Sequence, residues 1–253
     1  STTFKNGRIR YYRGSIRATI DILGNRRTVN LLNAEAYLRG VVPRESPAGW
    51  GDIAGGLGMN ALRAQSVAAR SYSLSEARYT YAKTCDTQDC QVYGGSALRE
   101  SVNGAIVALE HPLTDQAIAE TAGVVIVQPN GKPSRTEFTA SNGGRTAGGT
   151  FPAQVDPGDL ASEPVNNLLV WTRIISAAQL TAKYPQIGTL TSVVTKHDGL
   201  GGDWNGYATS VAINGTASTV TLKGYDFKSI FDLPAPWYET SSIYGAAFDA
   251  GPV

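Results

Sequence analysis

The sequence predicts an α+β fold, with helices mainly in the first half and mostly antiparallel strands elsewhere. Residues 60–83 present a dense face of small and apolar side chains, which is typical of a helix that packs closely against another element. Residues 15–31 instead alternate apolar and polar side chains, as strands do. The 28 glycines indicate many turns, which suits a strand-rich chain. We expect one domain that spans residues 1–253.

The first predicted element is a β-hairpin over residues 15–31, with its tight turn at Gly24-Asn25. Every second side chain of its first strand is apolar: Ile16, Ala18, Ile20 and Ile22. This period of two predicts that one face of the strand is buried.

A short helix is predicted over residues 34–42, because Asn33 is a good N-cap. Pro43 and Pro47 are expected to break it, which leaves Glu45 in a loop between two prolines. A glycine-rich loop then leads to the strongest helix, 60–83.

The second half is predicted to be mostly strands and turns. Helices are expected at 114–122 and 176–183, and the predicted strands are 123–128, 134–140, 190–196, 207–213 and 217–223. Asn214-Gly215 predicts the turn of the last hairpin. A loop over 141–149 contains four glycines.

The charge balance argues against several classes of function. A net charge of +1 gives no support to a nucleic-acid partner, whereas an uncharged polymer such as a carbohydrate is compatible. No apolar run approaches the roughly 18 residues that cross a membrane, and the residues from Ser1 onward do not have the basic-then-apolar pattern of a signal peptide. The chain does not begin with methionine, so we expect a processed or trimmed form.

Cys85 and Cys90 are the two cysteines, and their short spacing fits either a disulfide or half of a metal site. A disulfide is favoured because the histidines, His111 and His197, lie far away in the sequence. A disulfide would place the protein outside the cytoplasm.

Three segments carry a resemblance to a known family. They are Ala36–Trp50, which contains Pro43-Arg44-Glu45-Ser46-Pro47; Ala61–Leu74, which contains Ala64-Gln65-Ser66-Val67-Ala68-Ala69-Arg70; and Ser141-Asn142-Gly143-Gly144-Arg145-Thr146. In this order they resemble the hallmark segments of the stage II sporulation protein D (SpoIID/LytB) family. The resemblance runs from about residue 15 to 240.

This resemblance implies a bacterial lytic transglycosylase that is secreted or associated with the cell wall, a lyase that cuts peptidoglycan glycan strands. The expected substrates are strands without stem peptides, and the expected role is in sporulation, division or general wall turnover. The catalytic glutamate of the family falls on Glu45, and substrate is expected in a cleft between the helices and the strands. Some members bind zinc through cysteines and histidines near the second segment. Because this chain has no histidine there, we expect a Cys85–Cys90 disulfide, no metal and no cofactor.

One carboxyl suffices for this chemistry, since it can protonate the leaving oxygen and then accept the proton of the sugar's own 6-hydroxyl. Apolar neighbours of Glu45 are expected to raise its pKa, as an acid catalyst requires. The expected substrate-binding residues are Arg70, Tyr93, Ser141, Asn142, Gly143, Gly144 and Thr146.

Structural interpretations stay open beside these roles. Arg70 could orient Glu45 or bind a sugar, or form a buried ion pair. Tyr93 and Trp50 could stack on sugar rings or belong to the core. The 141–146 loop could be only a turn. Two other functions remain: a non-catalytic peptidoglycan-binding module that enhances a cell-wall amidase, and a hydrolase that uses Glu137 as a second carboxyl.

Overall fold

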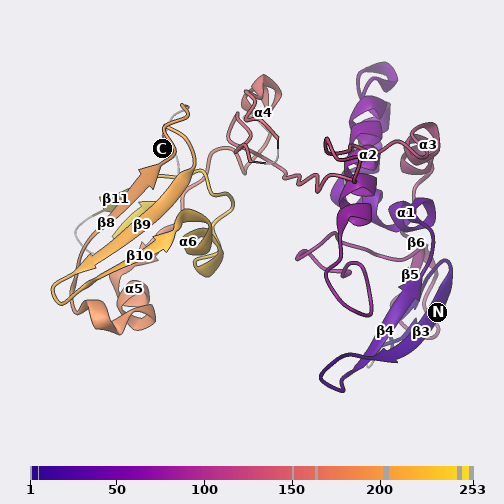
Figure 1. The fold of residues 1–253 in the computed structure, drawn as a ribbon, viewed down its shortest axis with the longest axis horizontal. Coiled ribbons are helices and arrows are strands. Elements are labelled where there is room, and N and C mark those ends of the chain that lie inside the picture. The colour runs from indigo at the N-terminus through magenta and orange to yellow at the C-terminus, as the bar shows by residue number, and fades with distance from the viewer. Residues whose placement is uncertain are drawn as a thin grey trace. The chain divides into compact units, whose positions relative to one another are not determined.

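The computed structural model describes residues 2–4, 6–149, 151–162, 165–201, 205–243 and 247–250. The chain divides into two compact units, residues 1–138 and 139–253, and each is described by itself (Figure 1). Both contain helices and antiparallel strands, so the predicted α+β class is confirmed. The single domain over 1–253 and the cleft stay predictions.

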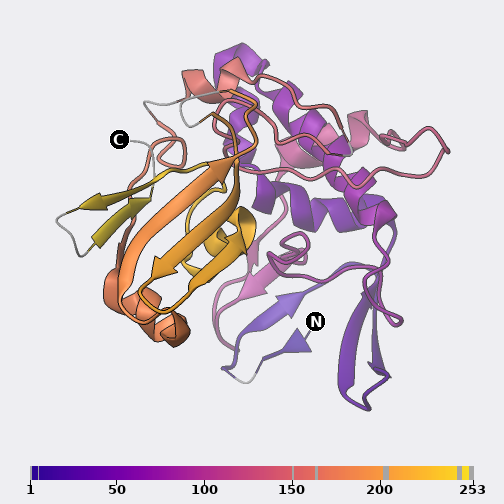
Figure 2. The same cartoon turned by 60° about the vertical axis from the view of Figure 1, so that its left-hand side comes forward.

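Unit 1 combines a helical layer with two small antiparallel sheets. Its helices are α1 (Ala34–Glu45), the 3-10 helix η1 (Ala48–Gly56), α2 (Met59–Ser75) and α3 (Pro112–Glu120). Its strands are β1 (Thr2–Thr3), β2 (Ile9–Tyr11), β5 (Ala97–Arg99) and β6 (Val107–Ala108), in the order β1-β2-β5-β6, and the hairpin β3 (Ser15–Ile20) with β4 (Arg26–Leu31). Helix α2 packs against both α1 and α3, as Figure 2 shows.

The core of unit 1 lies between α1, α2 and α3. It consists of Tyr37, Leu38, Val41, Val42, Ala69, Tyr93 and Ile118. Burial of these side chains, each apolar one worth about 1.5–3 kcal/mol, holds the helices together.

Unit 2 is built on the antiparallel sheet β10-β9-β8. Its strands are β7 (Ile174–Ser176), β8 (Leu190–His197), β9 (Ala208–Gly215), β10 (Thr219–Lys223), β11 (Thr240–Ile243) and β12 (Ala247–Ala250). Its helices are α4 (Pro157–Ala161), α5 (Ala177–Lys183), η2 (Pro185–Ile187) and α6 (Gly224–Ile230). Helices α5 and α6 pack on the main sheet, and Tyr238 and Phe227 are buried in its core.

Several predicted elements are confirmed with small shifts. The 15–31 hairpin, the Asn33 N-cap and the strands predicted at 190–196, 207–213 and 217–223 are present. The turn of the last hairpin falls at Thr216-Ala217 instead of Asn214-Gly215. Gly215 lies in the strand, and a Cβ at this position would lie 2.1 Å from the carbonyl oxygen of Ile187, so the close approach requires glycine there.

The predicted helix break at Pro43 is wrong. Helix α1 continues through Pro43 to Glu45, and the Ser46 N–H still donates to the Val42 carbonyl oxygen. A proline inside a helix costs about 3 kcal/mol, but Leu38, Val41 and Val42 are fully buried and their packing holds the last turn in place.

Two further corrections concern length. Helix α2 ends at Ser75 and not at residue 83. At this end, Lys83 Nζ donates to the carbonyl oxygens of Leu74 and Glu76. The strands predicted at 123–128 and 134–140 form only an isolated bridge between Val127 and Pro133. Their polar groups bond to α2 instead, as in the hydrogen bond of Thr136 Oγ1 to Ala68 O.

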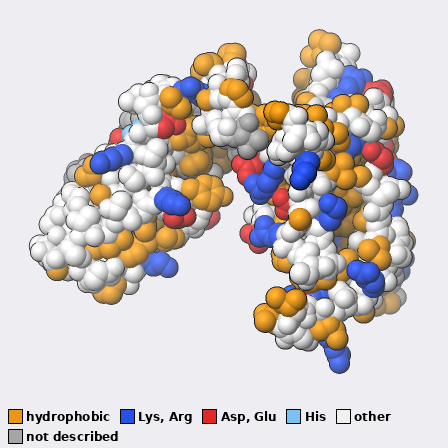
Figure 3. Space-filling view, in the orientation of Figure 1, with side chains coloured by type: hydrophobic (Ala, Val, Ile, Leu, Met, Phe, Trp, Pro, Cys, Tyr) orange, Lys and Arg blue, Asp and Glu red, His pale blue; other side chains and the backbone are white. Residues whose placement is uncertain are grey.

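The apolar face of the first hairpin strand is exposed, against the prediction. Ile20 is 65% exposed and Ile22 84% exposed, whereas Val29 on the return strand is buried. The hairpin therefore packs through its other face, and apolar side chains gather at its free end (Figure 3).

Candidate active site

Glu45 lies on the last turn of α1, on the face that packs into unit 1. Leu38 and Val41 precede it by seven and four residues, so the three side chains share one side of the helix. Leu38 and Val41 are fully buried, and Glu45, at the helix end, is partly exposed. The continuation of α1 through Pro43 therefore decides where this carboxyl points.

The Glu45 carboxyl has one hydrogen bond among the described residues. The backbone N–H of Val92 donates to its Oε1 at 2.7 Å. Among the described residues, Oε2 has no hydrogen-bond partner. Burial raises the pKa of Glu45, and the Val92 N–H partly offsets this because it stabilises the carboxylate. The predicted direction of this pKa shift is thus confirmed.

The segment that brings Val92 to Glu45 is held against α1 by buried polar contacts. The side chain of Gln91 is 1% exposed, accepts from the Tyr37 hydroxyl at 3.3 Å and donates to Ala69 O at 3.4 Å. The Gly94 N–H donates to Gly40 O at 3.0 Å. The Val92 N–H could not be predicted from the sequence, because a backbone donor leaves no signal in residue type.

Cys85 and Cys90 form a disulfide, with Cα atoms 5.6 Å apart, so this prediction is confirmed. Both sulfur atoms are used in the bond, and neither is available as a zinc ligand while it is closed. The bond closes a short ring that ends two residues before Val92.

Arg70 is 1% exposed and binds Glu35 instead of Glu45. Its Nε and Nη2 donate to the two carboxylate oxygens at 2.9 and 2.8 Å, and its guanidinium also reaches the carbonyl oxygens of Ile118 and Val124. Glu35 and Glu45 are ten residues apart on α1, about 15 Å along the axis. The interpretation that Arg70 orients Glu45 is wrong, and the contacts match the buried ion pair.

Tyr93 belongs to the core of unit 1. Its ring is 6% exposed and stacks on Tyr37 with centroids 5.1 Å apart, and its hydroxyl donates to Asn30 Oδ1 at 2.7 Å. Gly40 permits this packing, because a Cβ there would lie 2.5 Å from the Tyr93 ring. These contacts favour the core interpretation over sugar stacking.

The 141–146 loop lies in unit 2 and wraps around the carboxylate of Asp159. The Ser141 hydroxyl and the backbone N–H groups of Asn142 and Gly144 all donate to Asp159 Oδ2, at 3.0, 2.8 and 3.0 Å. Asp159 was not a predicted site residue, and its place after Pro157-Gly158 carries no recognisable signal.

The two glycines of this loop are needed for close packing. Gly143 has a φ of 71°, and a Cβ there would lie 2.4 Å from the Trp237 ring. Gly144 has a φ of 85°, and its Cβ would meet Leu160 at 2.5 Å. In unit 2, therefore, these glycines admit protein side chains.

Other polar groups of the loop also have partners, whereas Asn142 Oδ1 is buried and has none among the described residues. Thr146 Oγ1 accepts from the Gln154 N–H at 2.8 Å, and the Tyr207 hydroxyl lies 2.7 Å from the carbonyl oxygens of Asn142 and Arg145. These contacts give the loop a structural role. Sugar binding by Ser141, Asn142, Gly143, Gly144 and Thr146 stays a prediction.

Two side chains considered in the sequence are exposed. Trp50, in η1, is 43% exposed and so presents an indole at the surface of unit 1. Glu137 has a side chain that is 71% exposed and forms an ion pair with Arg135. The Glu137 carboxyl therefore lacks the apolar surroundings that a general acid uses.

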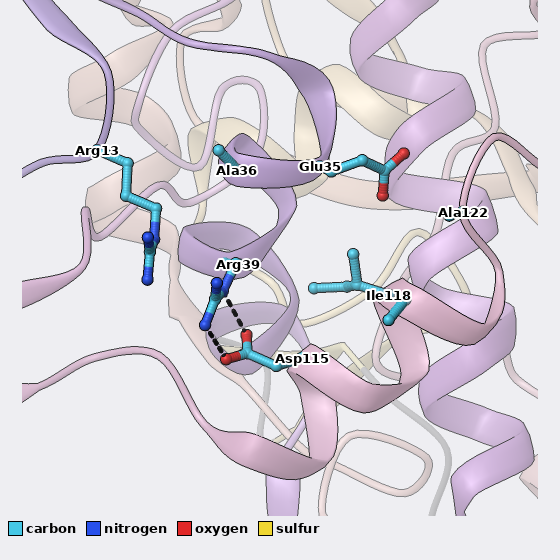
Figure 4. Close-up of a pocket in the computed structure, with 8 residues that line it drawn as sticks. Arg13, Glu35, Ala36, Arg39, Asp115, Ile118 and Ala122 are labelled. Atoms are coloured by element: carbon cyan, nitrogen blue, oxygen red, sulfur yellow. Dashed lines mark hydrogen bonds and ion pairs between the residues drawn. The ribbon is translucent and has the colours of Figure 1, made fainter.

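A cavity of about 310 Å³ in unit 1 is separate from Glu45. Arg13, Glu35, Arg39 and Asp115 supply its charged lining, and Figure 4 shows Arg39 paired with Asp115. These charges largely neutralise one another, and Glu45 is not among the lining residues.

The fold and the site define an α+β protein with a half-buried glutamate at a helix end, whose carboxyl accepts one hydrogen bond from the described residues. Residues 23–128 match the model of the SpoIID family, described as stage II sporulation protein. This match covers less than half of the chain, so the chain is similar to the family over that part, as the resemblance indicated, and the matched region contains Glu45, α2 and the disulfide.

Two relatives are similar over part of the chain. An amidase enhancer of Bacillus subtilis is 32% identical over 148 residues, which is 58% of this chain and 18% of the relative. An uncharacterised protein of Brachyspira hyodysenteriae is 34% identical over 122 residues, 47% of this chain and 28% of that protein. The chain thus spans under a third of either relative's length. Among the described residues, no helix is long and apolar enough to cross a membrane.

Proposed function

We propose that this protein is a lytic transglycosylase that cleaves the MurNAc-GlcNAc bond of peptidoglycan glycan strands, with Glu45 as the catalytic acid and then base. The observation that carries the proposal is the half-buried Glu45 carboxyl, whose pKa burial raises. A raised pKa increases the protonated fraction of the carboxyl at a given pH, and general acid catalysis uses the protonated form.

The reaction needs one carboxyl. Protonated Glu45 donates its proton to the glycosidic oxygen as the bond from that oxygen to C1 of MurNAc breaks. The 6-hydroxyl of the same sugar then bonds to C1, and its proton passes to the Glu45 carboxylate. The products are a 1,6-anhydro-MurNAc end and a free GlcNAc hydroxyl, no water is consumed, and Glu45 is again protonated.

The Val92 N–H supports both halves of this cycle. It occupies Oε1 at 2.7 Å and so leaves Oε2 as the oxygen that carries the proton. It also stabilises the carboxylate that forms after the first transfer.

A second candidate is a non-catalytic module that binds peptidoglycan and enhances a cell-wall amidase. The similarity to the Bacillus subtilis amidase enhancer favours it. In either case we propose an extracytoplasmic location at the bacterial cell wall, since a disulfide persists in oxidising compartments.

The test is to incubate the protein with peptide-free glycan strands and to identify the products by mass spectrometry. Glu45→Gln removes the acid, and Glu137→Gln is a matched control at an exposed carboxyl. We expect anhydro-MurNAc ends from the parent and from Glu137→Gln, and none from Glu45→Gln.

Other products would contradict the proposal. Hydrated reducing ends that disappear in Glu137→Gln would make the protein a hydrolase with a second carboxyl. Strand binding without cleavage, together with a faster amidase when the protein is added, would establish the enhancer function instead.

A further inference from the structure

The chain between Cys85 and Gly94 connects the disulfide to the Glu45 carboxyl. The Val92 N–H donates to Glu45, and the next N–H, that of Tyr93, donates to the carbonyl oxygen of Asp86 at 3.3 Å. Neighbouring backbone groups are thus fixed to two different elements, α1 and the disulfide ring. The position of the Val92 donor depends on both.

Asp86 lies inside the ring that the disulfide closes. Within this ring, the Cys85 N–H lies 3.1 Å from Cys90 Sγ and the Cys90 N–H donates to Thr87 O at 3.0 Å. Because only four residues separate the cysteines, ring closure leaves little freedom for the Asp86 carbonyl.

Apart from the disulfide bond, few contacts fix the conformation of the ring. The four side chains between the cysteines, those of Asp86, Thr87, Gln88 and Asp89, are all exposed. A hydrogen bond from Arg78 to the Asp89 carbonyl oxygen, at 3.0 Å, is itself at the surface. The disulfide is therefore the strongest constraint on the Asp86 carbonyl.

We propose that the Cys85–Cys90 disulfide is a positioning element for Glu45, because it holds the Asp86 carbonyl against Tyr93 and so keeps the Val92 N–H on Glu45 Oε1. For its consequence in catalysis this inference rests on the proposed function. Its statement about the geometry and ionisation of Glu45 does not.

Opening the disulfide has a directional effect on Glu45. The Val92 N–H favours the carboxylate, while burial by α1 disfavours it, so loss of the hydrogen bond moves the pKa of Glu45 further upward. Tyr37, on the same helix, is a titratable neighbour of Glu45. Burial raises the pKa of its phenol, and the negative charge of Glu45 raises it further. The Arg44 guanidinium lies against Gly94 and is exposed.

The test follows the Glu45 carboxyl by carbon-13 NMR in protein labelled at glutamate, with Glu45→Gln to assign the signal. The parent is titrated in the oxidised state and after reduction with dithiothreitol, beside the variant Cys85→Ser/Cys90→Ser. We expect the titration midpoint of Glu45 to move upward in both disulfide-free forms. The acid-to-alkaline profile of glycan cleavage should move in the same direction.

Two matched controls separate positioning from stability. Gln88→Ala changes the ring but keeps the disulfide, and Ile118→Val weakens the core of unit 1 without touching the ring. Both should leave the Glu45 midpoint in place.

The inference is overturned if reduction leaves the midpoint unchanged while far-UV circular dichroism shows a folded protein, or if Ile118→Val moves it equally. If the double serine variant does not fold, the reduced parent decides. A shifted midpoint in a protein that cleaves no glycan would support the positioning role and refute the proposed function.

Discussion

Replacing Glu35 by alanine should destabilise unit 1 and leave the ionisation of Glu45 unchanged. Arg70 is 1% exposed, and its guanidinium donates to both oxygens of Glu35 and to two backbone carbonyls. Removing one partner of a buried ion pair costs about 3–5 kcal/mol, since the other charge stays buried without its counter-ion.

The expected loss is smaller than this range. The Glu35 side chain is 41% exposed, so water can enter the space it leaves, and the carbonyls of Ile118 and Val124 remain bound to Arg70. We therefore expect the free energy of unfolding to fall by about 2–3 kcal/mol. Urea denaturation followed by far-UV circular dichroism measures it, because the helices α1 and α2 dominate that signal.

Three controls make this measurement specific. Glu35→Gln keeps an acceptor oxygen and should lose about 1 kcal/mol. Glu137→Ala breaks an exposed ion pair and should change stability by less than about 0.5 kcal/mol. In the double variant Glu35→Ala/Arg70→Leu, the loss should be smaller than the sum of the two single losses. If Glu35→Ala matches the parent, the ion pair does not hold Arg70, and a role in substrate binding regains support.

Two further predictions concern Glu45 and the 141–146 loop. Because burial raises the pKa of Glu45, the folded protein binds more protons than the unfolded one between the unfolded pKa of about 4.3 and the folded value, so this group's contribution to stability falls as pH rises through that window. Glu45→Gln lacks this loss. Urea titrations at pH 4 and pH 7 should therefore show that the free energy of unfolding of Glu45→Gln, relative to that of the parent, is higher at pH 7 than at pH 4. A difference that does not change with pH would contradict the raised pKa. Gly143→Ala should lower the melting temperature of unit 2 through a loss of about 2–3 kcal/mol, since it combines a positive φ with a clash against Trp237. Gly199→Ala also has a positive φ but meets no atom within 4 Å, so its loss should be about 1 kcal/mol, and equal losses would refute the packing argument.

Local patterns predicted the elements well where a single residue or turn defines them. Asn33 caps α1 through a hydrogen bond to the Ala36 N–H, as its residue type indicates. The three strands of the β10-β9-β8 sheet and the hairpin at 15–31 also lie close to where they were predicted. The absence of a histidine near Cys85 and Cys90 in the sequence favoured the disulfide, which is present.

The errors arose where packing at long range outweighs a local preference. Pro43 is a helix breaker by residue type, yet three buried side chains carry α1 past it. The period of two in β3 predicts a buried face but does not say which face the rest of the unit covers.

For the candidate site, the sequence by itself determined the resemblance to segments of the SpoIID family. The same resemblance is the basis for the proposal that Glu45 is the catalytic glutamate. Residue type and order suffice for this. Only the tertiary structure decided that Glu45 is half-buried on a helix, that Val92 is its donor, and that Arg70 pairs with Glu35. These facts depend on contacts between residues 35 to 47 positions apart, and burial and charge pairing at such separations leave no periodic trace in the sequence.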